Sequence, residues 1–136
     1  MKRLGGPRDQ PAWVRSAHAL HLRETRTFRQ RLLGLHAWQA WGDTPWGLLL
    51  PRCRAVQGWG LAQPVDLLFL GKAGEILRVL PQWSPGRCAV CPRAWAVLEL
   101  PPGYCRQAAW DRRIAQAWRR WAGANAYETL SRKIVA

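Results

Sequence analysis

Short apolar segments separated by closely spaced turn signals constrain the fold of this chain more than any other feature. Five such segments, at 47–50, 54–59, 65–70, 75–80 and 93–100, are expected to be strands, with a loop at 81–92. The Gly-Lys-Ala-Gly run at 71–74 has the composition of a hairpin turn. Strands at this spacing favour a small antiparallel β-sandwich or barrel over a parallel sheet with crossover helices.

Helical patterns flank these strands, so the expected fold class is α+β, mainly β. Residues 17–23 alternate like another short strand, and a helix follows, capped by Thr25 and ended by Gly34. These patterns divide the chain into a basic arm at 1–14, a β-rich domain at 15–105, and a C-terminal amphipathic helix with its tail at 106–136. The length of 136 residues suits one domain.

The C-terminal segment repeats its apolar residues with the period of a helix, predicted from Arg106 to Ala122 with Gly123 as its stop. One face carries Trp110, Ile114, Ala117, Trp118 and Trp121, and the other carries Arg112, Arg113, Gln116, Arg119 and Arg120. The Trp face is expected to pack on the sheet and cover an edge, and the alternative is a helix lying on an anionic membrane surface. The candidate polyanion contacts are Arg112, Arg113, Arg119 and Arg120.

An excess of arginine gives the chain a strongly positive field. The chain has 21 Lys and Arg residues against 8 Asp and Glu residues, a formal net charge of +13. Such a field attracts nucleic acids and anionic membranes without a specific site, although the codon usage of a GC-rich genome also produces an arginine excess. The apolar runs are too short to span a bilayer, and residues 1–13 lack the apolar stretch of a secretory signal. A cytoplasmic protein is therefore expected.

Asp66 lies inside an otherwise apolar strand, where an isolated carboxylate is costly unless it is paired. It is either a structural anchor for the backbone amides of a neighbouring loop or a pocket carboxylate, and the anchor is favoured because buried polar groups are nearly always hydrogen-bonded. Candidates for the same pocket or anchor are Gln57, Arg52 and Arg31. No carboxylate has a sequence spacing to Asp66 that predicts two-acid hydrolysis. Glu99 is the other candidate, its distance from Asp66 is not fixed by the sequence, and no catalytic residue is assigned.

Cys88 and Cys91 form a Cys-x-x-Cys pair, the usual half of a tetrahedral zinc site. Cys53 and Cys105 do not form a second such pair, and Pro92 argues against the helix that follows a thioredoxin-type motif. Zinc and a reversible disulfide stay as alternatives, but ordinary reduced thiols are favoured. No metal and no cofactor are expected.

Several segments, taken in order, are similar to one known family. They are RQRLLGL at 29–35, GLLLPRCRAVQGWG at 47–60, PVDLLFL at 64–70, GEILRVL at 74–80 and AVLELPPG at 96–103. With this order and spacing, the chain resembles the bacterial and archaeal family called domain of unknown function 192. Within that family, the Arg-Cys variant at 52–53 is similar to members encoded beside pilus-assembly and secretion genes.

The resemblance implies a β-rich fold and leaves the activity open, because the family has no settled biochemical role. It implies a non-enzymatic accessory or binding protein with a partner in a pilus or secretion system. The alternatives are a small-ligand binder or enzyme around Asp66, and a binder of nucleic acid or anionic membranes through the arginine-rich tail. The chain departs from the family pattern at Leu61 and Ala62, where a Met and a basic residue are usual, and in ending with a Trp- and Arg-rich helix.

Overall fold

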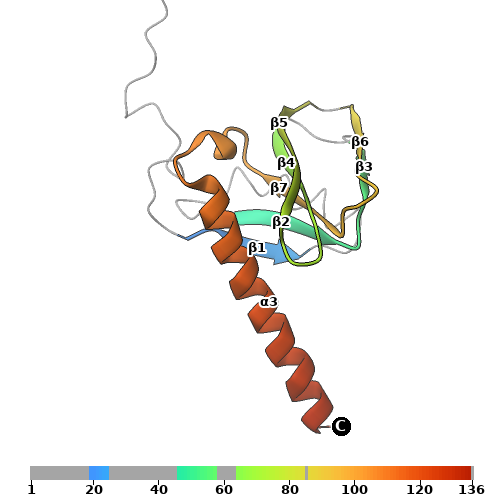
Figure 1. Cartoon of the computed structure of the whole chain (residues 1–136), viewed down its shortest axis with the longest axis vertical. Helices are drawn as coiled ribbons and strands as arrows, with labels where there is room; N and C mark the ends of the chain where they lie inside the picture. The colour runs from blue at the N-terminus through green and yellow to red at the C-terminus, as the bar shows by residue number, and fades with distance from the viewer. Residues whose placement is uncertain (1–18, 25–45, 58–63, 85, 136) are drawn as a thin grey trace, which may run out of the picture.

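The computed structural model describes residues 19–24, 46–57, 64–84 and 86–135. The strands in these ranges are β1 (His21–Glu24), β2 (Trp46–Pro51), β3 (Ala55–Gln57), β4 (Val65–Leu70), β5 (Ile76–Trp83), β6 (Cys88–Val90) and β7 (Ala96–Leu100). A short 3-10 helix, η2 (Tyr104–Arg106), then leads into the long helix α3 (Trp110–Val135) (Figure 1). The helix expected after Thr25 lies outside the described residues.

Five of the strands form one sheet in the order β1-β2-β7-β4-β5, and β3 pairs with β6 in a separate two-stranded ribbon. Neighbours run antiparallel except β1 and β2, which are parallel. The sheet is therefore mixed, and within the described part of the chain it is open at β1 and β5. The prediction of a mainly β fold is confirmed, whereas its barrel form and its purely antiparallel pairing are wrong. Residues 25–45 supply the long connection that a parallel pair requires.

Both faces of the sheet are covered. Alternation along β4 directs Leu68 and Leu70 to one face, and Val65, Leu67 and Phe69 to the other. The first face packs against α3, with Ile114, Ala117 and Trp118 in its cluster. The second packs against the ribbon through Val56 of β3 and Ala89 of β6. Because β4 is buried on both faces, its sequence is apolar at every position except Asp66.

The segment expected to be a loop at 81–92 contains more strand than its sequence suggests. Strand β5 continues through Pro81 to Trp83, and Cys88–Val90 forms β6. Pro81 is compatible with β5 because this strand lies at the edge of the sheet, where one row of N–H groups needs no strand partner. The prediction of a loop across 81–92 is therefore wrong, because both the end of β5 and the whole of β6 lie within it.

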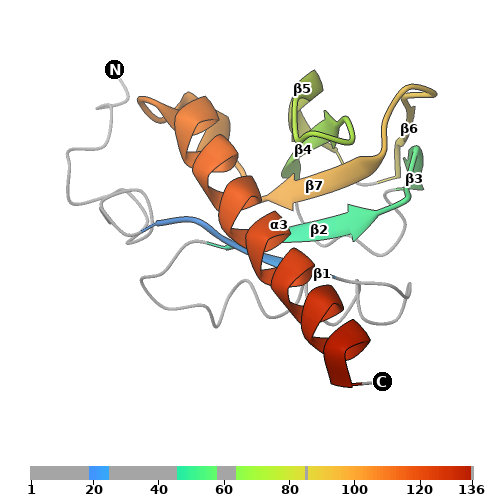
Figure 2. The same ribbon diagram turned by 60° about the horizontal axis from the view of Figure 1, so that its bottom comes forward.

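Helix α3 begins at Trp110, later than the predicted Arg106, and it continues through the predicted stop at Gly123 to Val135. Arg106 belongs to η2 instead. The Trp face docks as expected: Ile114, Ala117 and Trp118 are buried, and Trp110 and Trp121 pack beside them. Figures 1 and 2 show α3 crossing the sheet and its C-terminal turns extending past the strands. Gly123 does not end the helix because the residues after it include strong helix formers and no proline.

We predict that Gly123→Ala stabilises the protein by about 0.5–1 kcal/mol, because a Cβ there meets nothing within 4 Å and the backbone loses freedom in the unfolded chain. Urea denaturation measures the change in unfolding free energy. Gly74→Ala is the matched comparison: Gly74 has a φ of +80°, and a Cβ there would lie 2.5 Å from the Trp118 ring. It should destabilise the protein. A destabilised Gly123→Ala variant would contradict a continuous helix at this position.

Candidate functional site

The carboxylate of Asp66 is fully buried and receives three backbone N–H groups. The N–H groups of Gln82 and Gly103 donate to Oδ1 at 2.9 Å and 3.2 Å, and that of Cys105 donates to Oδ2 at 2.9 Å. Gln82 and Gly103 both have positive φ angles, 52° and 85°. Asp66 thus connects β4 with the end of β5 and with the segment between β7 and α3.

This geometry favours the structural role of Asp66 over a pocket role. Three N–H donors share its two oxygens, and hydrogen bonds to a charged acceptor are among the stronger ones in proteins. In the part of the chain that the structure describes, neither Gln57 nor Arg52 hydrogen-bonds to Asp66, and both are exposed near the ribbon. Arg31 lies outside the described residues.

The donors to Asp66 come from segments that sequence patterns could not connect with it. They are backbone groups 16, 37 and 39 residues away. Only the Pro-Pro-Gly turn at 101–103 signals that one of them occupies an unusual backbone conformation. Side-chain motifs therefore missed all three partners.

Asp66 also controls the chemistry of Cys105. Burial, the nearby Asp66 charge and a hydrogen bond to Asp66 together raise the pKa of the Cys105 thiol to about 12, and burial makes the largest contribution. The thiol is therefore protonated near neutral pH. Since a thiol reacts mainly as its thiolate, Cys105 is poorly nucleophilic.

The two buried carboxylates lie on opposite faces of the sheet. Asp66 is paired with Leu100, and Leu67 with Glu99, so alternation along the strands separates the acids. Glu99 is fully buried on the face opposite α3. This arrangement does not bring the two carboxylates together as a catalytic pair.

The four cysteines separate into two regions. Cys53 and Cys91 pack against the cluster beneath the ribbon, and Cys105 packs against the cluster beneath α3. Cys88 is exposed, and all four are free thiols. Among the described residues, no three His, Cys, Asp or Glu side chains are grouped so that they could hold a metal ion.

The four arginines predicted to contact a polyanion do not act as one set. Arg120 donates to the Leu20 carbonyl at 2.7 Å, and Arg113 donates to Gln107 Oε1 at 3.3 Å. Arg113 also lies beside Tyr104, where burial raises the pKa of the hydroxyl and the guanidinium partly offsets that rise. Arg112 and Arg119 are exposed to solvent. Arg119 also donates through Nε to the Ala115 carbonyl one turn earlier in the helix, at 3.3 Å. Two of the four arginines, Arg113 and Arg120, thus contact residues outside α3.

A second group of arginines surrounds the ribbon. The sequence singled out only one of them, Arg52, and as a candidate beside Asp66 instead of a surface contact. We call this group the ribbon arginines; its members are exposed and comprise Arg52, Arg54, Arg87 and Arg93. The Cys91 N–H donates to the Arg54 carbonyl at 2.8 Å, and the Ala94 N–H donates to the Cys91 carbonyl at 3.0 Å, which brings Arg54 and Arg93 to neighbouring turns. Neither 52–57 nor 86–95 contains Asp or Glu.

The ribbon is also tied to the main sheet. Arg78 of β5 donates to the Val90 carbonyl at 3.3 Å, and the Cys53 N–H donates to the Trp95 carbonyl at 3.1 Å. The ribbon arginines therefore project from a supported two-stranded platform. The signal for them was the pair of sequences Arg-Cys-Arg and Cys-Pro-Arg, which the strand pairing brings together.

Comparison with known proteins supports the fold and leaves the activity open. No family model matches the chain, and no curated protein matches it. The chain is similar to the crystal structure of a protein of unknown function from Novosphingobium aromaticivorans DSM 12444, with 19% sequence identity and a TM-score of 0.51. The match covers 65% of this chain and 69% of that one. Separately, none of the helices in the described residues has the length and apolar character needed to cross a membrane.

We predict that Asp66→Ala lowers the free energy of unfolding by about 1–3 kcal/mol, because it leaves buried N–H donors without their acceptor. Chemical denaturation measures this loss. Asp111→Ala, which removes an exposed carboxylate, serves as the control and should change stability little. Asp66→Ala with unchanged stability and lost binding of a ligand would assign Asp66 to a pocket instead.

We predict that Cys105 resists alkylation at pH values near 8.5, where an ordinary thiol is about half ionised, whereas exposed Cys88 reacts. The pKa of Cys105 rises on folding from 9.0 to about 12, so the folded state favours the protonated thiol. This contribution to stability is complete below pH 9 and is lost as the pH rises toward 12. Mass spectrometry after timed iodoacetamide treatment measures each site, and equal rates at Cys88 and Cys105 would contradict the prediction.

Proposed function

We propose that this protein is a non-enzymatic accessory or binding protein that recognises a negatively charged partner through the ribbon arginines. The observation that carries this proposal is the set of four exposed arginines that flank the paired strands β3 and β6, in segments that contain no carboxylate. A guanidinium presents a planar fork of N–H donors that matches phosphate and carboxylate geometry. An anionic partner therefore suits this surface both by charge and by hydrogen bonding.

The state of Asp66 supports a function carried by the surface. The backbone N–H groups of Gln82, Gly103 and Cys105 already bind both of its oxygens. A ligand would have to displace these bonds, and each displaced N–H would lose its buried partner. The ribbon arginines need no such rearrangement to meet a partner.

The resemblance to the domain of unknown function 192 family supports a more specific proposal. On that resemblance we propose a partner in a pilus-assembly or secretion system. The proposal of a cytoplasmic location rests instead on residues 1–13, which lack the apolar stretch of a secretory signal. A cytoplasmic location is in keeping with four reduced thiols.

The test compares two variants that remove the same charge from different surfaces. One changes all four ribbon arginines to Gln, and the other changes Lys72, Arg112, Arg119 and Lys133 to Gln. A fluorescein-labelled single-stranded DNA oligonucleotide, used as a polyanion, is titrated at several salt concentrations. Because each lost phosphate contact reduces the salt slope by roughly 0.7, four lost contacts should reduce it by roughly 3.

We predict that the ribbon variant loses most of its affinity and salt dependence, while the charge-matched variant keeps more of both. Circular dichroism and thermal melting check that each variant is folded. Equal losses in the two variants would mean that the net charge attracts the oligonucleotide without a defined site. That result would overturn the proposal.

A further inference from the structure

The distal half of α3 exposes three large apolar side chains. Tyr127 is 74% exposed, Leu130 is 58% exposed and Ile134 is 82% exposed. We call these three residues the distal stripe. At about 100° per residue, they fall within about 60° of one another around the helix. They therefore lie on one side of the C-terminal turns of α3. Figure 1 shows that these turns extend past the strands.

The distal stripe lies on the opposite side of α3 from the residues that dock on the sheet. The docked face comprises Trp110, Ile114, Ala117, Trp118 and Trp121. The centre of the distal stripe is roughly 150° away from the centre of this face, counted at about 100° per residue. The apolar side of the helix thus changes direction after Trp121, and the distal stripe does not extend the core contact.

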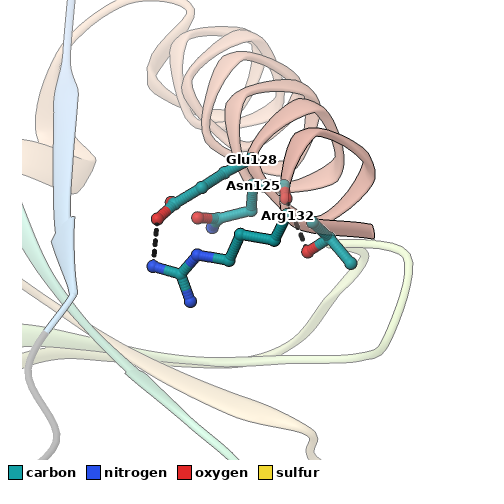
Figure 3. A network of polar contacts seen from close by, with 4 residues as sticks. Asn125, Glu128 and Arg132 are labelled. Carbon is teal, nitrogen blue, oxygen red and sulfur yellow. Dashed lines mark hydrogen bonds and ion pairs between the residues drawn. The ribbon is translucent and has the colours of Figure 1, made fainter. Parts of the chain in front are cut away.

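Polar residues continue the docked face into the distal half. Asn125, Glu128 and Arg132 lie there, and Figure 3 shows Arg132 paired with Glu128. The Thr129 hydroxyl donates to the Asn125 carbonyl at 2.9 Å. In the distal half of α3, the side that faces the same way as the docked Trp residues therefore carries polar and charged side chains.

The charged residues on the same side of α3 as the distal stripe are basic. Arg112, Arg119 and Lys133 are exposed and lie within about 60° of the nearest stripe residue when α3 is viewed along its axis. The acidic residues of the helix, Asp111 and Glu128, fall on other sides of it. We call the side that carries Arg112, Arg119, Lys133 and the distal stripe the outer face of α3. In the described helix, the outer face carries apolar and positively charged groups together with the neutral Gln116, and it contains no carboxylate.

We propose that the outer face of α3 lies on an anionic membrane surface, with the distal stripe in the interface and the basic residues at the lipid headgroups. A helix of 26 residues is about 39 Å long at 1.5 Å per residue, so both halves can contact one flat surface. The sheet packs on the opposite side of α3 and does not obstruct that surface. Tyr127 suits the interface because its ring is apolar and its hydroxyl is polar.

The charges favour a lipid surface over a second copy of the chain. Two outer faces brought together would place Arg and Lys side chains of both copies against each other, and like charges in contact are repulsive. A nucleic acid would satisfy the basic residues but would leave Leu130 and Ile134 without apolar neighbours. An anionic bilayer supplies both negative headgroups and an apolar interior. This inference is independent of the ribbon arginines.

Co-sedimentation of the full-length protein with vesicles tests the inference. The vesicles contain either phosphatidylcholine alone or phosphatidylcholine mixed with phosphatidylglycerol. The stripe variant carries Tyr127→Gln, Leu130→Gln and Ile134→Gln, which keeps the net charge and a good helix propensity. The matched control carries Leu77→Gln and Val90→Gln, which removes exposed apolar side chains from the strands.

We expect the parent protein to bind the anionic vesicles and to bind the neutral ones weakly. The stripe variant should lose at least about tenfold in affinity, since each removed apolar side chain would forfeit roughly a tenfold factor or more on full burial. The control variant should bind like the parent. A variant with Arg112→Gln, Arg119→Gln and Lys133→Gln should bind anionic vesicles less tightly and with weaker salt dependence.

Two results would overturn the inference. One is an anionic-vesicle affinity that is absent in the parent or unchanged in the stripe variant. The other is a parent protein that light scattering shows to be a dimer and a stripe variant that is a monomer, which would assign the stripe to a second copy. Vesicle binding that is lost in the ribbon variant but unchanged in the stripe variant is a form of the first result, because it would assign the vesicle contact to the ribbon arginines. Helix content by circular dichroism verifies that each variant keeps α3.

Discussion

The three hydrogen bonds to Asp66 fix where the chain goes after it leaves the central strands. Asp66 holds the end of β5 through Gln82 and the segment between β7 and α3 through Gly103 and Cys105. Without that carboxylate, two residues with positive φ would present N–H groups to a partly buried region with no acceptor. The position of η2, and with it the first turn of α3, therefore depends on one side chain in β4.

From that start, aromatic packing sets the direction of α3. Trp118 meets Trp95 edge to face with ring centroids 5.9 Å apart, and Trp121 lies 5.1 Å from Trp118. Gly74 passes so close to the Trp118 ring that a Cβ there would collide with it. Offset and edge-to-face rings of this kind contribute beyond their buried area. The proximal half of the helix is consequently part of the core, which leaves the distal half to project.

Sequence patterns predicted the features that depend on neighbours along the chain. The β4–β5 hairpin and the docked Trp face follow from local alternation and helical period. The parallel pairing of β1 with β2 and the pairing of β3 with β6 depend on long-range contacts that no local period encodes. The donors to Asp66 are backbone N–H groups, which no side-chain pattern in the sequence marks. Gly123 led to a wrong prediction of the end of α3, because a glycine ends a helix where the backbone turns left-handed.

The fold decides what each arginine can do, even if composition sets how many there are. Arg78 and Arg120 donate to main-chain carbonyls of other segments and so connect parts of the structure. The ribbon arginines and the outer face of α3 instead meet solvent. The segments 52–57 and 86–95 contain no Asp or Glu, and the two acidic residues of α3, Asp111 and Glu128, lie on other sides of the helix from the outer face. Self-repulsion among such groups costs stability, and a negatively charged partner reverses that cost. The two surfaces differ because only the outer face of α3 adds an apolar strip. A polyanion therefore complements the ribbon arginines, whereas an anionic lipid surface complements both the charges and the apolar side chains of the outer face.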